Sequence, residues 1–102
     1  MALMSFSMVP MDKGPSFSKY VAKTLTVIAE SGLPYRLNPM GTVVEGEWDD
    51  LVGLLTKCYR TLEAVSDRVS VTAKFDCRKG ASGALDRKIE SVQAEAGRTF
   101  ET

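Results

Sequence analysis

The chain has 102 residues, 44% of them hydrophobic and 25% charged, which is typical of one small globular domain. Thirteen basic and thirteen acidic residues cancel, so no net field favours nucleic acid or an anionic membrane as a partner. No apolar run approaches the roughly 20 residues of a membrane-spanning helix, and we expect a cytoplasmic protein.

Hydrophobic periodicity predicts the order strand, helix, strand, strand, helix, strand, helix. Ser16 or Ser18 can cap the first helix, and Trp48, which opens the second helix, is expected to be buried. Gly53 interrupts the second helical pattern, which indicates close packing there. The expected ranges are 3–9, 16–31, 35–38, 42–47, 48–65, 68–78 and 85–92.

This order predicts an α+β domain over residues 1–93, namely a ferredoxin-like βαββαβ sandwich. Its four-stranded antiparallel sheet carries two helices on one face, and a short C-terminal helix follows. Residues 94–102 are polar, and we expect them to be a frayed tail.

The two short strands are expected to form a hairpin whose two-residue loop is Met40-Gly41. In that register Arg36 faces Glu45, and Asn38 faces Val43. All four side chains then lie on the sheet face opposite the two helices.

The chain contains no histidine. This removes the commonest general base at neutral pH and the commonest metal ligand, and it excludes Ser-His-Asp or Cys-His catalysis within one chain. Cys58 and Cys77 do not form a Cys-x-x-Cys motif and are typical of two reduced thiols. We therefore expect a protein that is not an enzyme and needs no metal or cofactor.

One segment has the character of a family signature: Pro39-Met40-Gly41-Thr42-Val43-Val44-Glu45-Gly46, which follows Gly32-Leu33-Pro34-Tyr35. It resembles the small thiamine-binding proteins, a family of single-domain, ferredoxin-like proteins of about this length. The resemblance continues in Ser18-Lys19-Tyr20-Val21-Ala22, in Phe75-Asp76-Cys77-Arg78 and in Lys88-Ile89-Glu90-Ser91-Val92. It implies dimers of dimers that hold a ligand at a subunit interface.

The open face of the expected sheet is the place to look for a site, because two helices cover only the other face. It is rich in hydroxyl groups, and the third helix has an apolar stripe with no place in a two-layer domain. We expect a homo-oligomer, a tetramer above other states, whose subunits cover this face. The alternative is a solvated face on which Arg36 and Glu45 form an exposed ion pair of ~0.2–1 kcal/mol.

Thiamine or its hydroxymethylpyrimidine precursor suits such a site. Neutral side chains can bind the amino group and ring nitrogens of the pyrimidine, and an acidic one, Glu45 above all, can hold the positive thiazolium ring. Thr42 lies on the other face from Glu45, so both can act only if the turn twists. The candidate ligand-binding residues are Glu45, Asn38, Thr42, Ser7, Asp76, Val43 and Met40.

The expected function is therefore non-catalytic binding of thiamine or its precursor. An enzyme of the acylphosphatase type shares the topology, but residues 10–15 lack the arginine that its anion-binding loop uses. A regulatory or assembly module that binds another small molecule or a protein through the open face remains the alternative.

Overall fold

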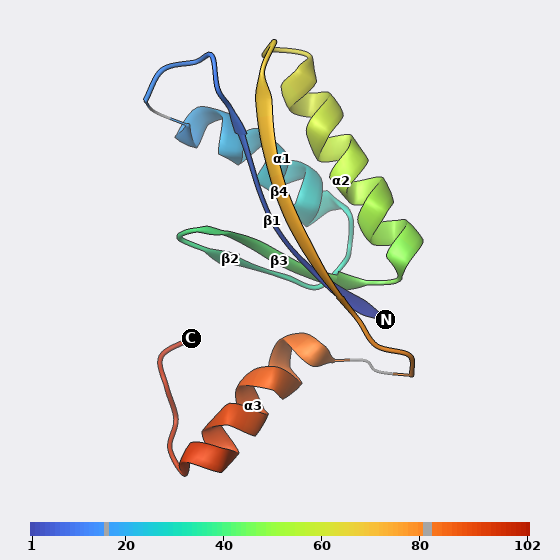
Figure 1. Ribbon diagram of the computed structural model, residues 1–102, viewed down its shortest axis with the longest axis vertical. Coiled ribbons are helices and arrows are strands. Elements are labelled where there is room, and N and C mark those ends of the chain that lie inside the picture. Colours follow the sequence, from blue (N-terminus) through green and yellow to red (C-terminus); the bar gives the residue numbers. More distant parts are fainter. Residues whose placement is uncertain (16, 81–82) are drawn as a thin grey trace.

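The computed structural model describes residues 1–15, 17–80 and 83–102 (Figure 1). Its elements follow the predicted order and confirm a ferredoxin-like α+β fold with an added helix. They are β1 (Ala2–Pro10), α1 (Ser18–Glu30), β2 (Tyr35–Asn38), β3 (Gly41–Gly46), α2 (Trp48–Glu63), β4 (Val69–Cys77) and α3 (Ala84–Ala96).

The sheet is antiparallel, with the strand order β2-β3-β1-β4. Helices α1 and α2 lie side by side on one face, while α3 lies apart from them beyond the end of the sheet (Figure 1). The alternating pattern of β1 buries Met4, Phe6 and Met8 against the two helices. The rest of the core cluster comprises Ala2, Ile28, Val44, Leu51, Leu54, Cys58 and Leu62.

Helix α2 shows why the local sequence folds as it does. Its buried residues recur every three or four positions and form one stripe against the sheet. Asp49 and Asp50 lie in the first turn and Arg60 in the last, where the helix dipole favours each charge. The buried stripe consists of Leu51, Leu54, Cys58 and Leu62.

Three local expectations are wrong. Ser18 is the first helical residue of α1 and not its cap; Phe17 takes the cap position without a side-chain hydrogen bond, and Ser16 lies outside the described residues. Trp48 is 51% exposed, although its ring lies 4.6 Å from that of Phe75. Nothing lies within 4 Å of a Cβ built on Gly53, so close packing does not explain that glycine.

The hairpin loop is Pro39-Met40 and not Met40-Gly41, because Asn38 pairs with Gly41. The shift moves every cross-strand pair by two residues, so Arg36 faces Val43 and not Glu45. A shift of two leaves each side chain on its predicted face, because side chains alternate with a period of two. What changes is position: Asn38 lies at the tip of the hairpin, away from Glu45.

Gly41 is required at this turn for a steric reason. A Cβ at this position would lie 2.7 Å from the carbonyl oxygen of Phe6 on the neighbouring strand. The backbones of β3 and β1 therefore approach each other so closely here that position 41 has no room for a side chain.

Helix α3 is longer than expected and extends to Ala96. Beyond it, the backbone N–H of Phe100 donates to the Gln93 side chain at 2.8 Å. None of the helix's described residues is fully buried, although Ala84, Leu85 and Ile89 are half-buried. No helix within residues 1–15, 17–80 and 83–102 combines the length and the apolar character that crossing a membrane demands.

The two cysteines differ in environment, which predicts different reactivity. Burial raises the pKa of the Cys58 thiol to about 11, whereas Cys77 is exposed on β4. The thiolate is the reactive form, so we expect a thiol reagent at pH 8 to label Cys77 alone in the native protein. Mass spectrometry of the labelled protein should show one adduct, and Cys77→Ser should abolish it. Rapid labelling of Cys58 without denaturant would contradict this expectation.

Candidate functional site

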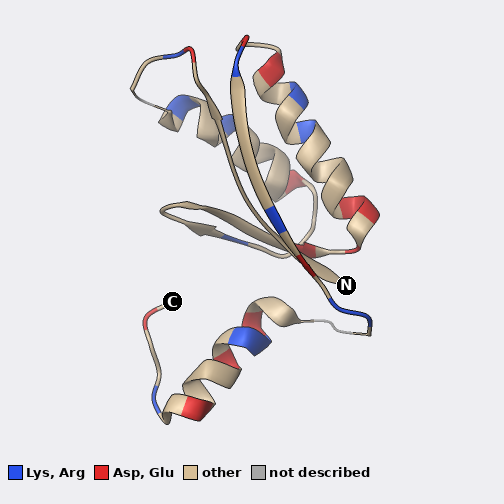
Figure 2. Ribbon diagram, viewed as in Figure 1, with Lys and Arg blue, Asp and Glu red and all other residues tan. Residues whose placement is uncertain are grey.

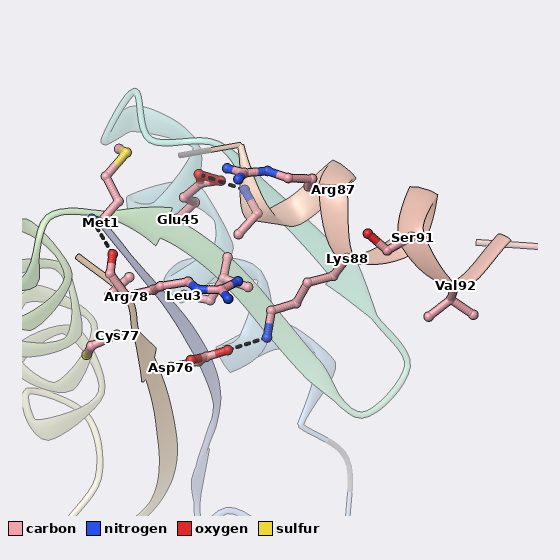
Figure 3. A pocket seen from close by; sticks show the side chains of 12 residues that line it. Met1, Leu3, Glu45, Asp76, Cys77, Arg78, Arg87, Lys88, Ser91 and Val92 are labelled. Atoms are coloured by element: carbon pink, nitrogen blue, oxygen red, sulfur yellow. Dashed lines mark hydrogen bonds and ion pairs between the residues drawn. The ribbon is translucent and has the colours of Figure 1, made fainter. Parts of the chain in front are cut away.

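Two cavities border the sheet, and the candidate residues are divided between them. The first, the α3 pocket, has a volume of about 580 Å³ and lies between α3 and one end of the open face (Figure 3). It is lined by Met1, Ala2, Leu3, Glu45, Asp76, Cys77, Arg78, Ala84, Arg87, Lys88, Ser91 and Val92.

Glu45 is only 3% exposed in the α3 pocket, and its carboxylate is already engaged. It accepts hydrogen bonds from the backbone N–H groups of Gly83 at 2.8 Å, Ala84 at 3.3 Å and Leu85 at 3.3 Å. These groups form the N-terminus of α3, whose free N–H groups and dipole favour a negative charge. Glu45 therefore caps α3 from a different element.

Two ion pairs complete the attachment of α3. Arg36 pairs with Asp86, so the alternative in which Arg36 and Glu45 form an exposed ion pair is wrong. Lys88 pairs with Asp76 on β4, and its hydrogen bond and charge lower the pKa of that carboxyl group. All four side chains are at least 40% exposed, so each pair contributes little to stability.

The charges of the α3 pocket do not favour a cationic ligand. Figure 3 shows Arg87 beside Glu45, and Lys88 reaching Asp76. Arg78 also lines the cavity. A cation would have to displace the helix N-terminus or Lys88 from the carboxylates while lying near two arginines.

The second cavity, the hairpin groove, has a volume of about 450 Å³ and lies between α1, the end of β1 and the β2–β3 hairpin. None of the described residues that line it is charged, and the tip of the hairpin carries no charged residue in Figure 2. Its lining residues are Phe6, Ser7, Met8, Val9, Phe17, Val21, Thr24, Ile28, Leu37, Asn38, Pro39, Met40, Gly41 and Thr42.

The groove exists because β3 is shorter than β1. The ladder between the two strands stops at the pair Phe6–Thr42, and β1 continues to Pro10. Met1 and Arg78 exchange both backbone hydrogen bonds, at 3.2 and 3.3 Å, so the odd-numbered residues of β1 point their backbone groups at β4. Those of Met8 must then point the other way, past the end of β3 into the groove.

Neutral side chains surround this free backbone edge. Ser7, Asn38 and Thr42 line the groove, and the structure gives their side chains no hydrogen-bond partner within the described residues. Thr42 is only 6% exposed, yet no fully buried side-chain oxygen or nitrogen in the described chain lacks a partner. Its hydroxyl group is therefore reached from the cavity.

The structure thus divides the seven candidates into two groups and one single residue. Val43 lies on the open face between Arg36 and Ser5 and lines neither cavity. Thr42 and Glu45 lie on opposite faces of the sheet, as expected, and they line different cavities, so they do not act in one site. Ser7, Asn38, Met40 and Thr42 meet at the hairpin groove, whereas Glu45 and Asp76 line the α3 pocket.

Sequence reasoning missed the two groups that complete these cavities. The backbone edge of Met8 carries no side-chain signal, although the unequal lengths of the first and third strands could have suggested it. Arg87 and Lys88 were missed because the third helix was placed by its apolar residues alone. No group of three or more His, Cys, Asp or Glu side chains able to hold a metal occurs within the residues that the structure describes.

The fold defines a ferredoxin-like α+β domain, and comparison with known proteins identifies its family. Residues 4–93 match the model of the thiamine-binding protein family. UPF0045 protein MJ1052 of Methanocaldococcus jannaschii is 35% identical over 86 residues, which are 84% of this chain and 86% of that protein. The chain therefore belongs to the thiamine-binding protein family.

Solved structures of similar proteins have the same fold. The crystal structure of MJ1052, described as a hypothetical protein, has a TM-score of 0.83 at 33% identity and covers 89% of this chain and 94% of that one. A domain of unknown function from Bacillus cereus gives 0.79 at 28% identity, covering 92% and 91%. A putative thiamine biosynthesis/salvage protein from Thermotoga maritima also gives 0.79, covering 89% and 97%, and at 21% identity it supports the fold alone.

Proposed function

We propose that this protein binds thiamine or its hydroxymethylpyrimidine precursor without catalysis. The pyrimidine ring lies in the hairpin groove, and a second subunit covers it in a homo-oligomer, most simply a tetramer. Membership of the thiamine-binding protein family supports the class of ligand. The groove supports the position, because it is uncharged in its described part and lined by neutral hydrogen-bonding groups.

The free backbone edge of Met8 carries the proposal. One N–H donor and one C=O acceptor of the same residue point into the groove from β1. An aminopyrimidine presents an amino donor beside a ring-nitrogen acceptor, so the two edges are complementary. Ser7, Asn38 and Thr42 can bind the remaining polar atoms, and Phe17 and Met40 provide apolar walls.

A covering subunit is part of the proposal because the hairpin exposes apolar side chains beside the groove. Met40 is 89% exposed and Leu37 is 58% exposed. Large apolar side chains that cluster on a surface mark an interaction site more often than isolated ones do. Covering them would also exclude water from the ligand. The groove's described side chains include no acid, base or thiol, which supports binding and not catalysis.

Calorimetry with hydroxymethylpyrimidine tests the position of the site. Thr42→Val keeps the β-branched shape and removes only the hydroxyl group. We expect affinity to fall about 3- to 10-fold, because one hydrogen bond contributes ~0.5–1.5 kcal/mol and 1.4 kcal/mol corresponds to tenfold.

Thr26→Val is the matched control, because Thr26 is exposed on α1 and its hydroxyl donates to the Ala22 carbonyl at 2.9 Å. Its affinity should equal that of the wild type. Equal affinities for both variants would remove Thr42 from the site. Failure of the wild type to bind either thiamine or the precursor would reject the proposed function itself.

A further inference from the structure

The α3 pocket carries more positive charge than its own carboxylates neutralise. Both acidic side chains that line it have partners: Glu45 accepts three backbone N–H groups of α3, and Asp76 pairs with Lys88. Arg78 and Arg87 also line the cavity, and neither forms an ion pair within the part of the chain that the structure describes. These two arginines are therefore available to an anionic ligand.

The ion pair of Lys88 and Asp76 leaves the charge of Arg78 in place. The hydrogen bond and the charge of Lys88 are the main causes of the lowered pKa of the Asp76 carboxyl group, and the charge of Arg78 lowers it further. Asp76 is thus already held as an anion by the lysine. The positive field of Arg78 reaches this part of the cavity without forming a pair there.

The two arginines stand on different walls of the α3 pocket. Arg78 directly follows the last residue of β4, and Figure 3 shows its side chain extending toward α3. Arg87 lies on α3 itself, beside Glu45 (Figure 3). Both residues are exposed, so solutes can reach their guanidinium groups. An anion between the walls can contact both.

The sequence of α3 explains why its wall of the cavity is polar. The lining residues are spaced by three, one, three and one positions, which places them on one face of the helix. A helix that packs against a sheet usually presents apolar side chains on such a face. Here basic and hydroxyl side chains occupy its centre, which indicates a role in binding. The face consists of Ala84, Arg87, Lys88, Ser91 and Val92.

We propose that the α3 pocket binds a phosphomonoester, a small organic molecule that carries one terminal phosphate group. Phosphate is favoured over carboxylate because one arginine can occupy both oxygens of a carboxylate, whereas a tetrahedral phosphate has oxygens for two guanidinium groups. The hydroxyl group of Ser91 can donate to a further oxygen. Leu3 and Val92 provide apolar contact for the organic group.

The cavity has the size that such a ligand needs. Its volume of about 580 Å³ lies within the range of ~300–1,000 Å³ that small-molecule sites occupy. It shares no described lining residue with the hairpin groove. Phosphomonoester binding therefore does not depend on whether a pyrimidine binds in the groove, and the experiments below use neither thiamine nor its precursor.

Binding at this position couples the ligand to the attachment of α3. The ligand contacts the helix through Arg87 and the sheet through Arg78, so the site is complete only while the helix is in place. None of the described residues of α3 is fully buried, which makes the helix prone to local opening. A ligand that binds only the closed form slows opening about tenfold when its concentration is roughly ten times the Kd.

Calorimetry with phenyl phosphate tests the site. Inorganic phosphate lacks the organic group and benzoate replaces the phosphate by a carboxylate, so we expect both to bind more weakly. Arg78→Gln and Arg87→Gln should each weaken the binding of phenyl phosphate about 10- to 100-fold, the range expected for the loss of a charge-assisted contact. No binding of phenyl phosphate to the wild type at millimolar concentration would overturn the proposal, and benzoate of equal affinity would reject the ligand class.

Two further variants separate a specific site from general attraction between charges. Arg98→Gln changes the net charge by the same amount, but Arg98 lies beyond the end of α3 and does not line the cavity, so its affinity should equal that of the wild type. Arg87→Lys keeps the charge and loses the planar fork, so it should still bind more weakly than the wild type. An equal loss in Arg98→Gln, or wild-type affinity in Arg87→Lys, would reject a built phosphate site.

Hydrogen exchange checks the position of the ligand independently. Phenyl phosphate at about ten times its Kd should slow the exchange of residues 84–96 about tenfold, whereas the N–H groups of α2 should not change. Arg87→Gln should remove this protection at the same ligand concentration. Unchanged exchange in α3, or equal protection of α2, would place the ligand outside the α3 pocket.

A lipid headgroup is the other source of a phosphomonoester. Vesicles of phosphatidylcholine that contain phosphatidate present this group at a membrane surface, and we expect the protein not to sediment with them. Sedimentation with these vesicles that Arg87→Gln abolishes would assign the site to a lipid and reject a free ester.

Discussion

Gly41→Ala is expected to destabilise the protein by about 1–3 kcal/mol, as overpacking in a close-packed region does. The new Cβ would lie 2.7 Å from the Phe6 carbonyl oxygen. Neither atom can move away freely, because each is attached to the backbone of a paired strand. The strands must therefore separate at the end of their ladder. At ~4–8 °C per kcal/mol for a domain of this size, thermal unfolding should occur roughly 5–20 °C lower.

The same substitution in α2 provides a control of opposite sign. Gly53 is exposed within a helix, and nothing lies within 4 Å of a Cβ built there. Gly53→Ala should raise stability by about 0.5–1 kcal/mol, because alanine has the higher helix propensity. If Gly41→Ala melts at the wild-type temperature, the close approach of β3 and β1 is not as the structure places it. The affinity of the Gly41→Ala variant for the pyrimidine should also fall, since Gly41 lines the hairpin groove.

The fold was predictable because its signals are periodic. Alternation along β1 and β4 and the apolar stripe of α2 each specify one buried face, and every predicted element is present. The hairpin register was not predictable by counting from Gly41. A loop of Pro39-Met40 and one of Met40-Gly41 give the same faces, so hydrophobic patterning could not distinguish them.

The candidate site was predictable in its residue types more than in its arrangement. Ser7 comes from β1, and Asn38, Met40 and Thr42 come from the β2–β3 hairpin, yet all four line one groove. They were selected mainly as neutral hydrogen-bonding residues, and an error in the register of the β2–β3 hairpin does not change that property. Glu45 and Asp76 were selected for charge, and charged groups find partners that periodicity does not reveal. Those partners come from α3, whose position depends on polar contacts far apart in the sequence.

Glu45→Gln should release α3 while leaving the rest of the domain folded. The carboxylate accepts three backbone N–H groups at a helix N-terminus, and α3 has no buried residue among those described. Hydrogen bonds to a charged group contribute ~1.5–3 kcal/mol, and glutamine keeps the size but loses the charge. Local opening of α3 should then become about 10- to 100-fold more frequent, at 1.4 kcal/mol per decade.

Amide hydrogen exchange measures this opening directly. The N–H groups of residues 84–96 should exchange faster in the variant, whereas those of β1 should not change. Glu47→Gln is the matched control, because Glu47 precedes α2, is exposed, and forms no side-chain cap. Unchanged exchange in α3 would mean that the ion pairs of Arg36 and Lys88 are sufficient to hold the helix.

The same variant distinguishes the two possible roles of Glu45. If the ligand lies in the hairpin groove, Glu45→Gln should change the affinity for hydroxymethylpyrimidine and for thiamine by less than about twofold. If Glu45 holds the thiazolium ring, thiamine should bind at least tenfold more weakly while the uncharged precursor is unaffected, since only thiamine carries the charge. That second result would place the cation in the α3 pocket and require α3 to move when thiamine binds, because the helix N-terminus and the ligand would compete for one carboxylate.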